Sequence, residues 1–358
     1  MKNLKTQGFI LIDVDVVALN NAGKSNSTDA ENGVATKRIR KNGRNYTYVS
    51  GQAWRYWWRN TLQKTFNWDL SPITRETKVA FTAANPIQFA DDDVFGYMKA
   101  AKEVVVDEKG KEKKEDVTVT RASPLKNSAI VSVTSVQVEE NWSSMSRHEG
   151  DAVPYTKQEY SAIMKGMFSL DLEAVGTFAS YNKTGFKNLS AKLREEALAQ
   201  AGSSEIADPH LPSAKGEAHQ LVRLDKAIRI QRIEDTLAAL KFLSGGAMQT
   251  NNMADVTPKF VILATTNSGN HPFSHIATSK GISDQVFELN VDGIEEIIRD
   301  FKAQIQGKVF IGHRSGFLGS DDVQKLEVLK SQYPDVVELG SINESIDKYV
   351  AQVKSQIP

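Results

Sequence analysis

The segment GFILIDVDVV at residues 8–17 decides the fold class of this chain. Its side chains alternate between two faces, with the period of two expected of a β-strand. Apolar residues occur on both faces, so the segment is predicted to be a central strand of a sheet that is covered on both sides. One face carries Ile10, Ile12, Val14 and Val16, and the other carries Phe9, Leu11, Asp13, Asp15 and Val17.

A long polar connection and a helix are expected next. Residues 20–45 are rich in Asn, Gly, Ser and Lys and have no apolar periodicity, which predicts a mobile loop of a length that is usually functional or disordered. Ser50 can cap a helix that begins near Gly51. The helical stripe of apolar residues consists of Trp54, Trp57, Trp58 and Leu62.

The rest of the chain predicts an α+β architecture with helices packed on a sheet. Residues 73–126 resemble an insertion that ends in a hairpin with its tip at Asp107, Lys109 and Gly110. Helices are expected over residues 157–167 and 217–243, and a loop over residues 202–216. From Lys308 onward the pattern is strand, helix, strand, helix, with an acidic composition.

Composition excludes several classes of protein. The 358 residues are 40% apolar and 25% charged and contain no cysteine, so the chain is folded, without disulfides, thiolate metal sites or thiol nucleophiles. Asp13 and Asp15 interrupt the first apolar run, and no cleavage site follows it. Neither a signal peptide nor a membrane span is therefore expected, and the predicted location is the cytoplasm.

A net charge of zero conceals two oppositely charged ends. Residues 1–64 contain eleven lysines and arginines against four aspartates and glutamates, whereas residues 284–358 contain eight against thirteen. Such a polar molecule can bind a polyanion with one end and still associate with copies of itself. Charge drift along an ordinary surface is the alternative.

Nucleic-acid features are the strongest functional signal. No acidic residue occurs between Asn32 and Trp68, and this stretch contains a basic track of Lys37, Arg38, Arg40, Lys41 and Arg44. Uncompensated charge of this kind binds phosphates, because each neutralised phosphate releases counterions. Tyr46 and Tyr48 follow and could stack on single-stranded bases, and Arg55 and Arg59 continue the track along one helix face. A solvated loop with two tyrosines in the core is the alternative.

Signals for catalysis or for a cofactor are weak. Asp13 and Asp15 share a strand face and could hold a divalent ion, but paired carboxylates on a strand more often face lysine or arginine. The run from Asp91 to Asp93 precedes an apolar helical segment, which favours capping and turn roles. His271 and His275 are separated by Pro272 and lack a further ligand, so no metal or other cofactor is predicted.

An ordered set of segments resembles one known family. The set begins with residues 8–23 and resembles the DevR-like backbone subunit of type I-B CRISPR surveillance complexes. This subunit is the Cas seven family of Cascade and belongs to the RAMP superfamily. The other matching segments are YVSGQAWRYWWR at 48–59, DDDVFGYM at 91–98, RASPL at 121–125, SLDL at 169–172, VGTF at 175–178 and SGGAMQT at 244–250.

The resemblance implies a modified RRM-like, ferredoxin-type palm with large finger and thumb insertions. Residues 1–70 would form the first strand, the basic loop and a helix of the palm, and residues 71–130 the inserted finger and thumb segment. Residues 131–305 would complete the palm with a helical insertion, and residues 306–358 would form an α/β extension for packing or subunit contacts.

The resemblance also implies a non-catalytic protein that polymerises along a CRISPR RNA and leaves the guide bases free to pair with a target DNA strand. Partners would be the guide RNA, other copies in a helical filament and other Cascade subunits. Related type III subunits cut RNA with a loop aspartate, so metal-dependent cleavage involving Asp13, Asp15 or Asp29 is one alternative. A stand-alone autoregulatory nucleic-acid-binding protein is the other. The expected RNA contacts include four residues of the basic track. They are Asn20, Asn21, Lys37, Arg38, Arg40, Lys41, Gln52, Arg55, Arg59, Arg121, Gln249 and Thr250.

Overall fold

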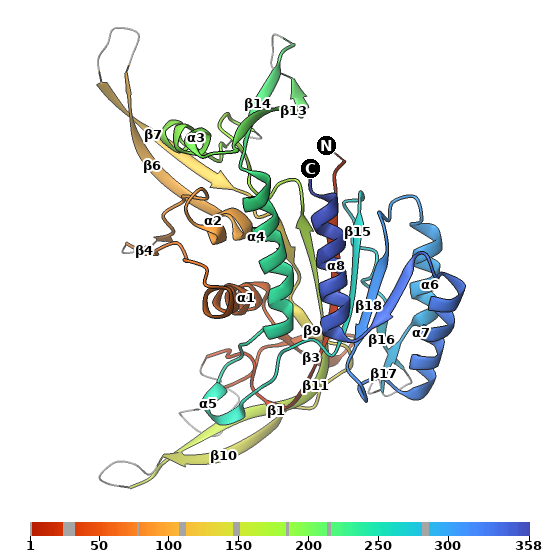
Figure 1. Cartoon of the computed structure of the whole chain (residues 1–358). Helices are drawn as coiled ribbons and strands as arrows, with labels where there is room; N and C mark the ends of the chain where they lie inside the picture. Colours follow the sequence, from red (N-terminus) through yellow and green to blue (C-terminus); the bar gives the residue numbers. More distant parts are fainter. Residues whose placement is uncertain are drawn as a thin grey trace.

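The computed structural model describes residues 2–23, 33–76, 79–106, 112–145, 151–183, 186–212, 216–280 and 286–358 (Figure 1). The expected α+β class is confirmed, since a large mixed sheet is packed with several helices. The helices are α1 (Gly51–Phe66), α2 (Ala90–Phe95), α3 (Ala191–Ala199), α4 (Lys226–Ala238), η1 (Ala239–Phe242), α5 (Gln249–Asn252), α6 (Val291–Asp300), α7 (Ser320–Gln332) and α8 (Ile342–Gln356).

The main sheet has ten strands. Its order is β19-β18-β15-β1-β11-β9-β3-β2, and β8 and β10 also pair with β11. These strands are β1 (Lys5–Val17), β2 (Arg38–Lys41), β3 (Arg44–Val49), β8 (Leu125–Asn127), β9 (Ile130–Ser132), β10 (Glu139–Met145), β11 (Val153–Asp171), β15 (Phe260–Thr266), β18 (Val309–His313) and β19 (Val337–Gly340).

Smaller sheets complete the fold, with the strand orders β12-β14-β13, β16-β17, β4-β5 and β6-β7. Their strands are β4 (Thr74–Arg75), β5 (Ala80–Phe81), β6 (Tyr97–Val106), β7 (Glu112–Arg121), β12 (Thr177–Ala179), β13 (Ser204–Pro212), β14 (Ala218–Arg223), β16 (Ala277–Lys280) and β17 (Val286–Leu289).

Strand β1 is central and buried on both faces, as its sequence predicts. Ile10 and Ile12 belong to the core beneath α1, α4 and α8, which lie beside one another in Figure 1. Phe9 and Leu11 belong to a second core, to which α6 and α7 contribute Ile294 and other apolar residues. The sheet is therefore the middle layer between two sets of helices.

Four antiparallel neighbours form the centre of this sheet. Their order is β15-β1-β11-β9, and α1 lies between β1 and β9 in the chain while α4 lies between β11 and β15. The capping oxygen of α1 is that of Ser50, which accepts a hydrogen bond from the Ala53 amide at 3.3 Å. The predicted stripe of Trp54, Trp57, Trp58 and Leu62 is buried.

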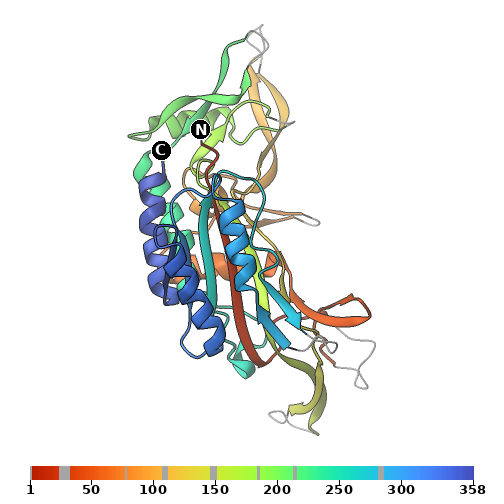
Figure 2. The ribbon, with the colours of Figure 1, turned by 90° about the vertical axis from the view of Figure 1, so that its right-hand side faces the viewer.

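Hairpins project from the layers. Figure 2 shows the β2–β3 hairpin extending to the right of the sheet and the β10–β11 arm extending below it. The hairpin expected in the insertion is confirmed as β6–β7, but its predicted tip at Asp107, Lys109 and Gly110 lies outside the described residues.

Outside the basic segment of residues 20–45, three predicted elements are wrong. Residues 157–167 are part of β11 and not a helix, because hydrogen bonding to both β1 and β9 outweighs the local helix propensity. Residues 204–212 of the expected loop form β13 against β14. The expected helix over 217–243 begins only at Lys226, after Asp225 caps it by accepting from the Ala227 amide.

Within the described residues, no helix combines the length and the apolar character that crossing a membrane requires.

Candidate nucleic-acid interface

Most of the basic track lies on a tight β-hairpin, and the expectation of an irregular loop is wrong for that part. Strands β2 and β3 pair in register from Arg38↔Thr47 to Lys41↔Arg44. Asn42 and Gly43 form the turn with φ angles of 51° and 78°. Two positive φ values are the signature of a type I′ turn, for which Asn-Gly is a preferred sequence. This dipeptide was the signal that could have predicted the hairpin.

The hairpin presents positive charge to solvent. Arg38, Ile39, Arg40 and Lys41 are all exposed. Among the described residues, no carboxylate forms an ion pair with Arg38, Arg40 or Lys41. The Lys41 ammonium lies 5.5 Å from the centre of the Tyr46 ring, which is buried against the sheet. The cations are therefore available to an anionic ligand, whereas Tyr46 is not available for stacking.

Asn20 fastens the base of the hairpin. It is only 6% exposed, its Oδ1 accepts from the Lys37 amide at 2.9 Å, and its Nδ2 donates to the carbonyl of Tyr48. Asn21 is exposed, and its Oδ1 accepts from the Gly23 amide at 2.6 Å. Asn20 thus positions the basic strand, and Asn21 is the accessible member of the pair.

Helix α1 carries one accessible candidate and two that are engaged within the protein. Gln52 is exposed. Arg55 donates to the carbonyl of Leu125 at 2.6 Å and to Ser123 Oγ at 3.0 Å. Burial, reinforced by the nearby Arg59, lowers the pKa of Arg55 to about 10. Arg59 pairs with Asp91 at 3.2 Å, so both arginines connect α1 to the inserted segment.

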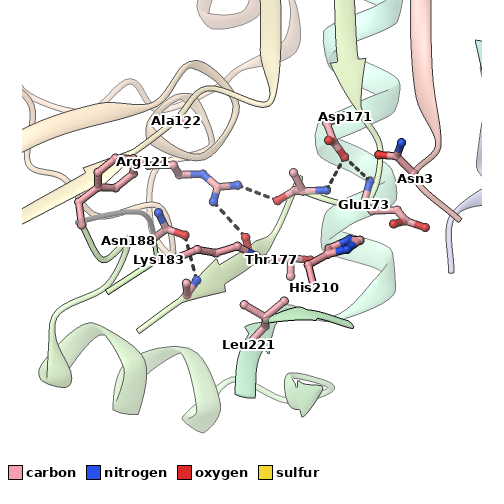
Figure 3. Close-up of a pocket in the computed structure, with 13 residues that line it drawn as sticks. Asn3, Arg121, Ala122, Asp171, Glu173, Thr177, Lys183, Asn188, His210 and Leu221 are labelled. Atoms are coloured by element: carbon pink, nitrogen blue, oxygen red, sulfur yellow. Dashed lines mark hydrogen bonds between the residues drawn. The ribbon is translucent and has the colours of Figure 1, made fainter. Parts of the chain in front are cut away.

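Arg121 is a core residue. It is 5% exposed and donates to the carbonyls of Ala174 at 2.7 Å and Thr177 at 3.0 Å, at the wall of a cavity of about 320 Å³ (Figure 3). Its guanidinium also pairs with Asp93 and lies 4.4 Å from the centre of the Phe178 ring. Direct contact between Arg121 and a ligand would require part of this network to open.

Asp93 is the centre of a buried charge cluster that the sequence did not predict. Its second oxygen accepts from Arg232 Nη1 at 2.7 Å and from the Gly176 amide at 2.8 Å. The carboxylate is fully buried, and the Arg121 and Arg232 side chains are 3% and 8% exposed. The expected capping role of the acidic run is wrong, because Phe89 is the N-cap residue of α2, no side chain caps the helix, and all three aspartates lie within it. Asp93 instead joins the inserted segment to α4 and to the turn at Gly176.

The remaining candidates lie on the short helix α5. Thr250 is exposed. Gln249 is half-buried, and its Nε2 donates to the carbonyl of Gly245 within the same turn. Asn252, at the end of α5, donates to the carbonyl of Val16 at 3.2 Å and to Glu159 Oε1 at 3.0 Å. Helix α5 is thereby attached to the end of β1.

Val16 departs from the predicted strand alternation. The register of β1 against β11 shifts between Val14 and Val17, and Val16 turns outward to 57% exposure with φ at 47°. This conformation is costly for a β-branched residue. Its amide donates to Ser161 Oγ at 3.0 Å and its carbonyl accepts from Asn252, so hydrogen bonds on both sides hold the strained backbone.

The substitution Val16→Asn is expected to stabilise the protein by about 1 kcal/mol, because asparagine tolerates the left-handed region and little buried surface is lost. Urea unfolding would measure the change. The control is Val14→Asn in the regular, buried part of the same strand, which should destabilise the protein. If Val16→Asn is as harmful as Val14→Asn, the backbone at Val16 is not strained.

The two described acidic candidates, Asp13 and Asp15, do not belong to a metal centre. Asp15 accepts a hydrogen bond from Ser161 Oγ, and Asp13 is exposed. Although Asp13 is exposed overall, partial desolvation by the surrounding protein and the nearby Asp15 raise its pKa, and Lys259 acts in the opposite direction. Across the described ranges, no three carboxylate or imidazole side chains converge on a possible metal position. Asp29 lies outside the described residues.

The predicted contacts thus differ both in the elements that carry them and in their exposure to solvent. The structure brings Lys37, Arg38, Arg40 and Lys41 together on one hairpin, whereas Gln52, Arg121 and Thr250 lie on separate elements. The exposed members are Asn21, Arg38, Arg40, Lys41, Gln52 and Thr250; the half-buried or buried members are Asn20, Lys37, Arg55, Arg59, Arg121 and Gln249.

Comparison with known proteins identifies the family. The model of the family described as "CRISPR-associated negative auto-regulator DevR/Csa2" matches residues 10–286. Two similar solved chains, each 12% identical, are titled "CRISPR RNA-guided surveillance complex" and "CRISPR RNA-guided surveillance complex, pre-nicking". The superposition on the first has a TM-score of 0.41 and spans 97% of this chain and 99% of the solved chain. The superposition on the second has a TM-score of 0.43 and spans 98% of this chain and 100% of the solved chain. No curated protein matches the sequence significantly. With more than half of its length matched by the family model, the chain belongs to the DevR/Csa2 family of CRISPR-associated proteins.

Proposed function

We propose that this chain is a CRISPR RNA-binding backbone subunit of a type I, I-B-like Cascade surveillance complex. The observation that carries the proposal is the exposed cationic strand of Arg38, Arg40 and Lys41, which no described carboxylate neutralises. Counterion release makes such a strand a phosphate-binding element. Membership of a CRISPR-associated family supports a CRISPR RNA as the polyanion.

The proposed scaffold is an RRM-like palm. The antiparallel order β15-β1-β11-β9, with α1 and α4 as the two connecting helices, supports this assignment. Residues 1–70 and 131–305 would form the palm, and residues 71–130 the inserted finger and thumb segment. The thumb would be the projecting hairpin β6–β7 within that segment. Residues 306–358 would form the C-terminal extension, in which β18, β19 and α8 add to the sheet and its core.

The proposed mode of binding is sequence-independent. Cations on a hairpin hold the RNA backbone and leave the bases free to pair with a target DNA strand. The exposed residues Asn21, Gln52 and Thr250 would add polar contacts. The buried candidates, such as Asn20 and Arg121, would act by holding the elements that carry these contacts. Copies would assemble side by side on one guide with other Cascade subunits, in the cytoplasm and without catalysis.

A second candidate is an autoregulatory nucleic-acid-binding protein that acts alone, which the family's description as a negative auto-regulator favours. The two functions differ in assembly, because a backbone subunit extends along its RNA and a repressor stays a discrete oligomer. Metal-dependent cleavage through Asp13, Asp15 or Asp29 has no comparable support in the described residues.

Light scattering on the protein with a repeat-containing CRISPR RNA of two defined lengths tests the proposal. The mass of the complex is expected to increase in steps with RNA length, because each copy would occupy a fixed length of guide. The protein without RNA is the control. A single mass that does not change with RNA length would favour the autoregulator, and a mass that RNA does not change at all would contradict both.

A further inference from the structure

A cavity of about 480 Å³ with both polar and apolar walls lies beside the basic hairpin, at the junction of β1, β10 and β11. Its wall contains hydroxyl, amide and carboxylate groups and the outward-turned Val16. The Val136 amide in this wall donates to the carbonyl of Asn45 at 2.9 Å, and Asn45 pairs with Arg40 in the hairpin. The cavity is therefore directly attached to the element proposed to hold phosphates.

The charge of the cavity is opposite to that of the hairpin. Glu139 and Glu159 both line it and are direct cross-strand partners in β10 and β11. Like charges in that relation destabilise a sheet. Glu159 is 6% exposed, and its oxygens accept from Lys157 at 2.7 Å and Asn141 at 3.0 Å, whereas Glu139 is exposed.

Burial opposes ionisation of Glu159, but hydrogen bonds from Lys157, Asn141 and Asn252 outweigh it and lower its pKa. The carboxylate is therefore ionised at neutral pH. Tyr160, 3% exposed, has its pKa raised by burial to about 12, so its hydroxyl stays protonated, but this side chain belongs to the core and its hydroxyl lies beside Thr47. Of the two carboxylates in the wall, Glu159 is paired with Lys157 at 2.7 Å, so the exposed Glu139 supplies the negative charge of the cavity.

The lining selects the class of ligand. The exposed Glu139 carboxylate repels a phosphate, whereas the charge of Glu159 is already paired with Lys157. A metal ion is disfavoured because Lys157 and Asn252 already donate to Glu159, and no three-ligand group exists among the described residues. Neutral hydroxyl groups suit the cavity, because a carboxylate accepts a strong hydrogen bond from a hydroxyl. Sugars alternate with phosphates along a nucleic-acid strand, so a strand held by the hairpin brings sugars beside the cavity.

We propose that this cavity binds the ribose 2′-hydroxyl of an RNA strand held by the hairpin, with Glu139 as an acceptor and Thr134 as a further polar contact. The inference rests on the proposed RNA-binding function and adds to it a means of selecting RNA over DNA, since the 2′-hydroxyl is the group that distinguishes the two. The strained backbone at Val16 places an apolar side chain at the edge of the cavity, where it would pack against the sugar.

The test compares three single-stranded oligonucleotides of one sequence, made of RNA, 2′-fluoro RNA and DNA. Fluorine keeps the sugar shape of RNA but cannot donate a hydrogen bond. The wild-type protein is expected to bind RNA about tenfold more tightly than the other two strands, as measured by fluorescence anisotropy. A factor of about ten in affinity corresponds to the free energy of about one charge-assisted hydrogen bond. In the variant Glu139→Ala/Thr134→Val this ratio should fall to about one.

The matched control is Glu140→Ala, which removes the same charge from the adjacent position of β10 without altering the cavity wall. It should change the affinity for all three strands alike and keep the wild-type ratio. Circular dichroism would verify that each variant is folded.

The outcomes separate this inference from the proposed function. If the wild-type protein binds RNA and 2′-fluoro RNA equally, the inference is wrong and the proposed RNA binding stands. The same holds if the Glu139→Ala/Thr134→Val variant keeps the wild-type ratio of affinities. Wild-type protein that binds none of the strands overturns the proposed function and the inference together.

Discussion

The substitution Asp93→Ala is expected to destabilise the protein by about 3–5 kcal/mol, the usual effect of removing one partner of a buried ion pair. The carboxylate is fully buried and pairs with both Arg121 and Arg232, whose side chains are almost as buried. Without it, two guanidinium groups would remain in the core with no counterion. The loss is a large part of the roughly 5–15 kcal/mol that stabilises a typical domain. Urea unfolding followed by circular dichroism measures it.

The control is Asp347→Ala. Asp347 also forms an ion pair, with Lys241, but its side chain is 59% exposed. Solvent screens such a pair, and its removal should change the unfolding free energy by at most about 1 kcal/mol. Equal effects of the two substitutions would mean that the Asp93 cluster contributes no more than a surface pair.

This cluster also explains why some candidate residues could not be assigned from sequence. Arg121 lies in the segment RASPL, one of those that resemble the family, and its charge suggested an RNA contact. The sequence does not show that Asp93 and Arg232, 28 and 111 positions away, meet it in the core. Arg55 is a similar case, because the carbonyl of Leu125 that it binds belongs to a distant strand. Pairing over such separations is a property of the tertiary fold.

The elements predicted correctly are those whose apolar pattern matches their final environment. Strand β1 has apolar residues on both faces and is buried on both faces, and α1 has a capping serine and one apolar stripe. Strand β11 was mistaken for a helix over residues 157–167, where Lys, Gln and Met favour helices. Its conformation is set by β1 and β9 on either side, which the local sequence does not reveal.

The accessible part of the site could be predicted in charge but not in shape. The basic track was evident from the absence of acidic residues, yet its description as a mobile loop missed the turn at Asn42 and Gly43. The hairpin fixes the positions of its cations, with Arg38 and Arg40 on one face of β2 and Lys41 on the other, whereas a loop would have to order them on binding. The entropic cost of binding is therefore lower than the sequence suggested.

The triple substitution of Arg38, Arg40 and Lys41 by alanine is expected to weaken binding of single-stranded RNA about 50-fold at 0.15 M salt, because each lost phosphate contact forgoes the release of about 0.7 counterion. The same reasoning lowers the slope of log affinity against log salt by about 2. All three side chains are exposed, so the fold should be unaffected. Fluorescence anisotropy over a salt series measures both quantities.

A change of net charge alone would also weaken binding, so the control removes three exposed lysines from the C-terminal part of the chain, Lys302, Lys325 and Lys330. The two variants have the same net charge, and only the position of the lost charges differs. A slope that falls in the hairpin variant and stays at the wild-type value in the control assigns the counterion release to the hairpin. Equal slopes in the two variants would mean that RNA responds to the overall charge of the protein, and the proposed interface would lie elsewhere on its surface.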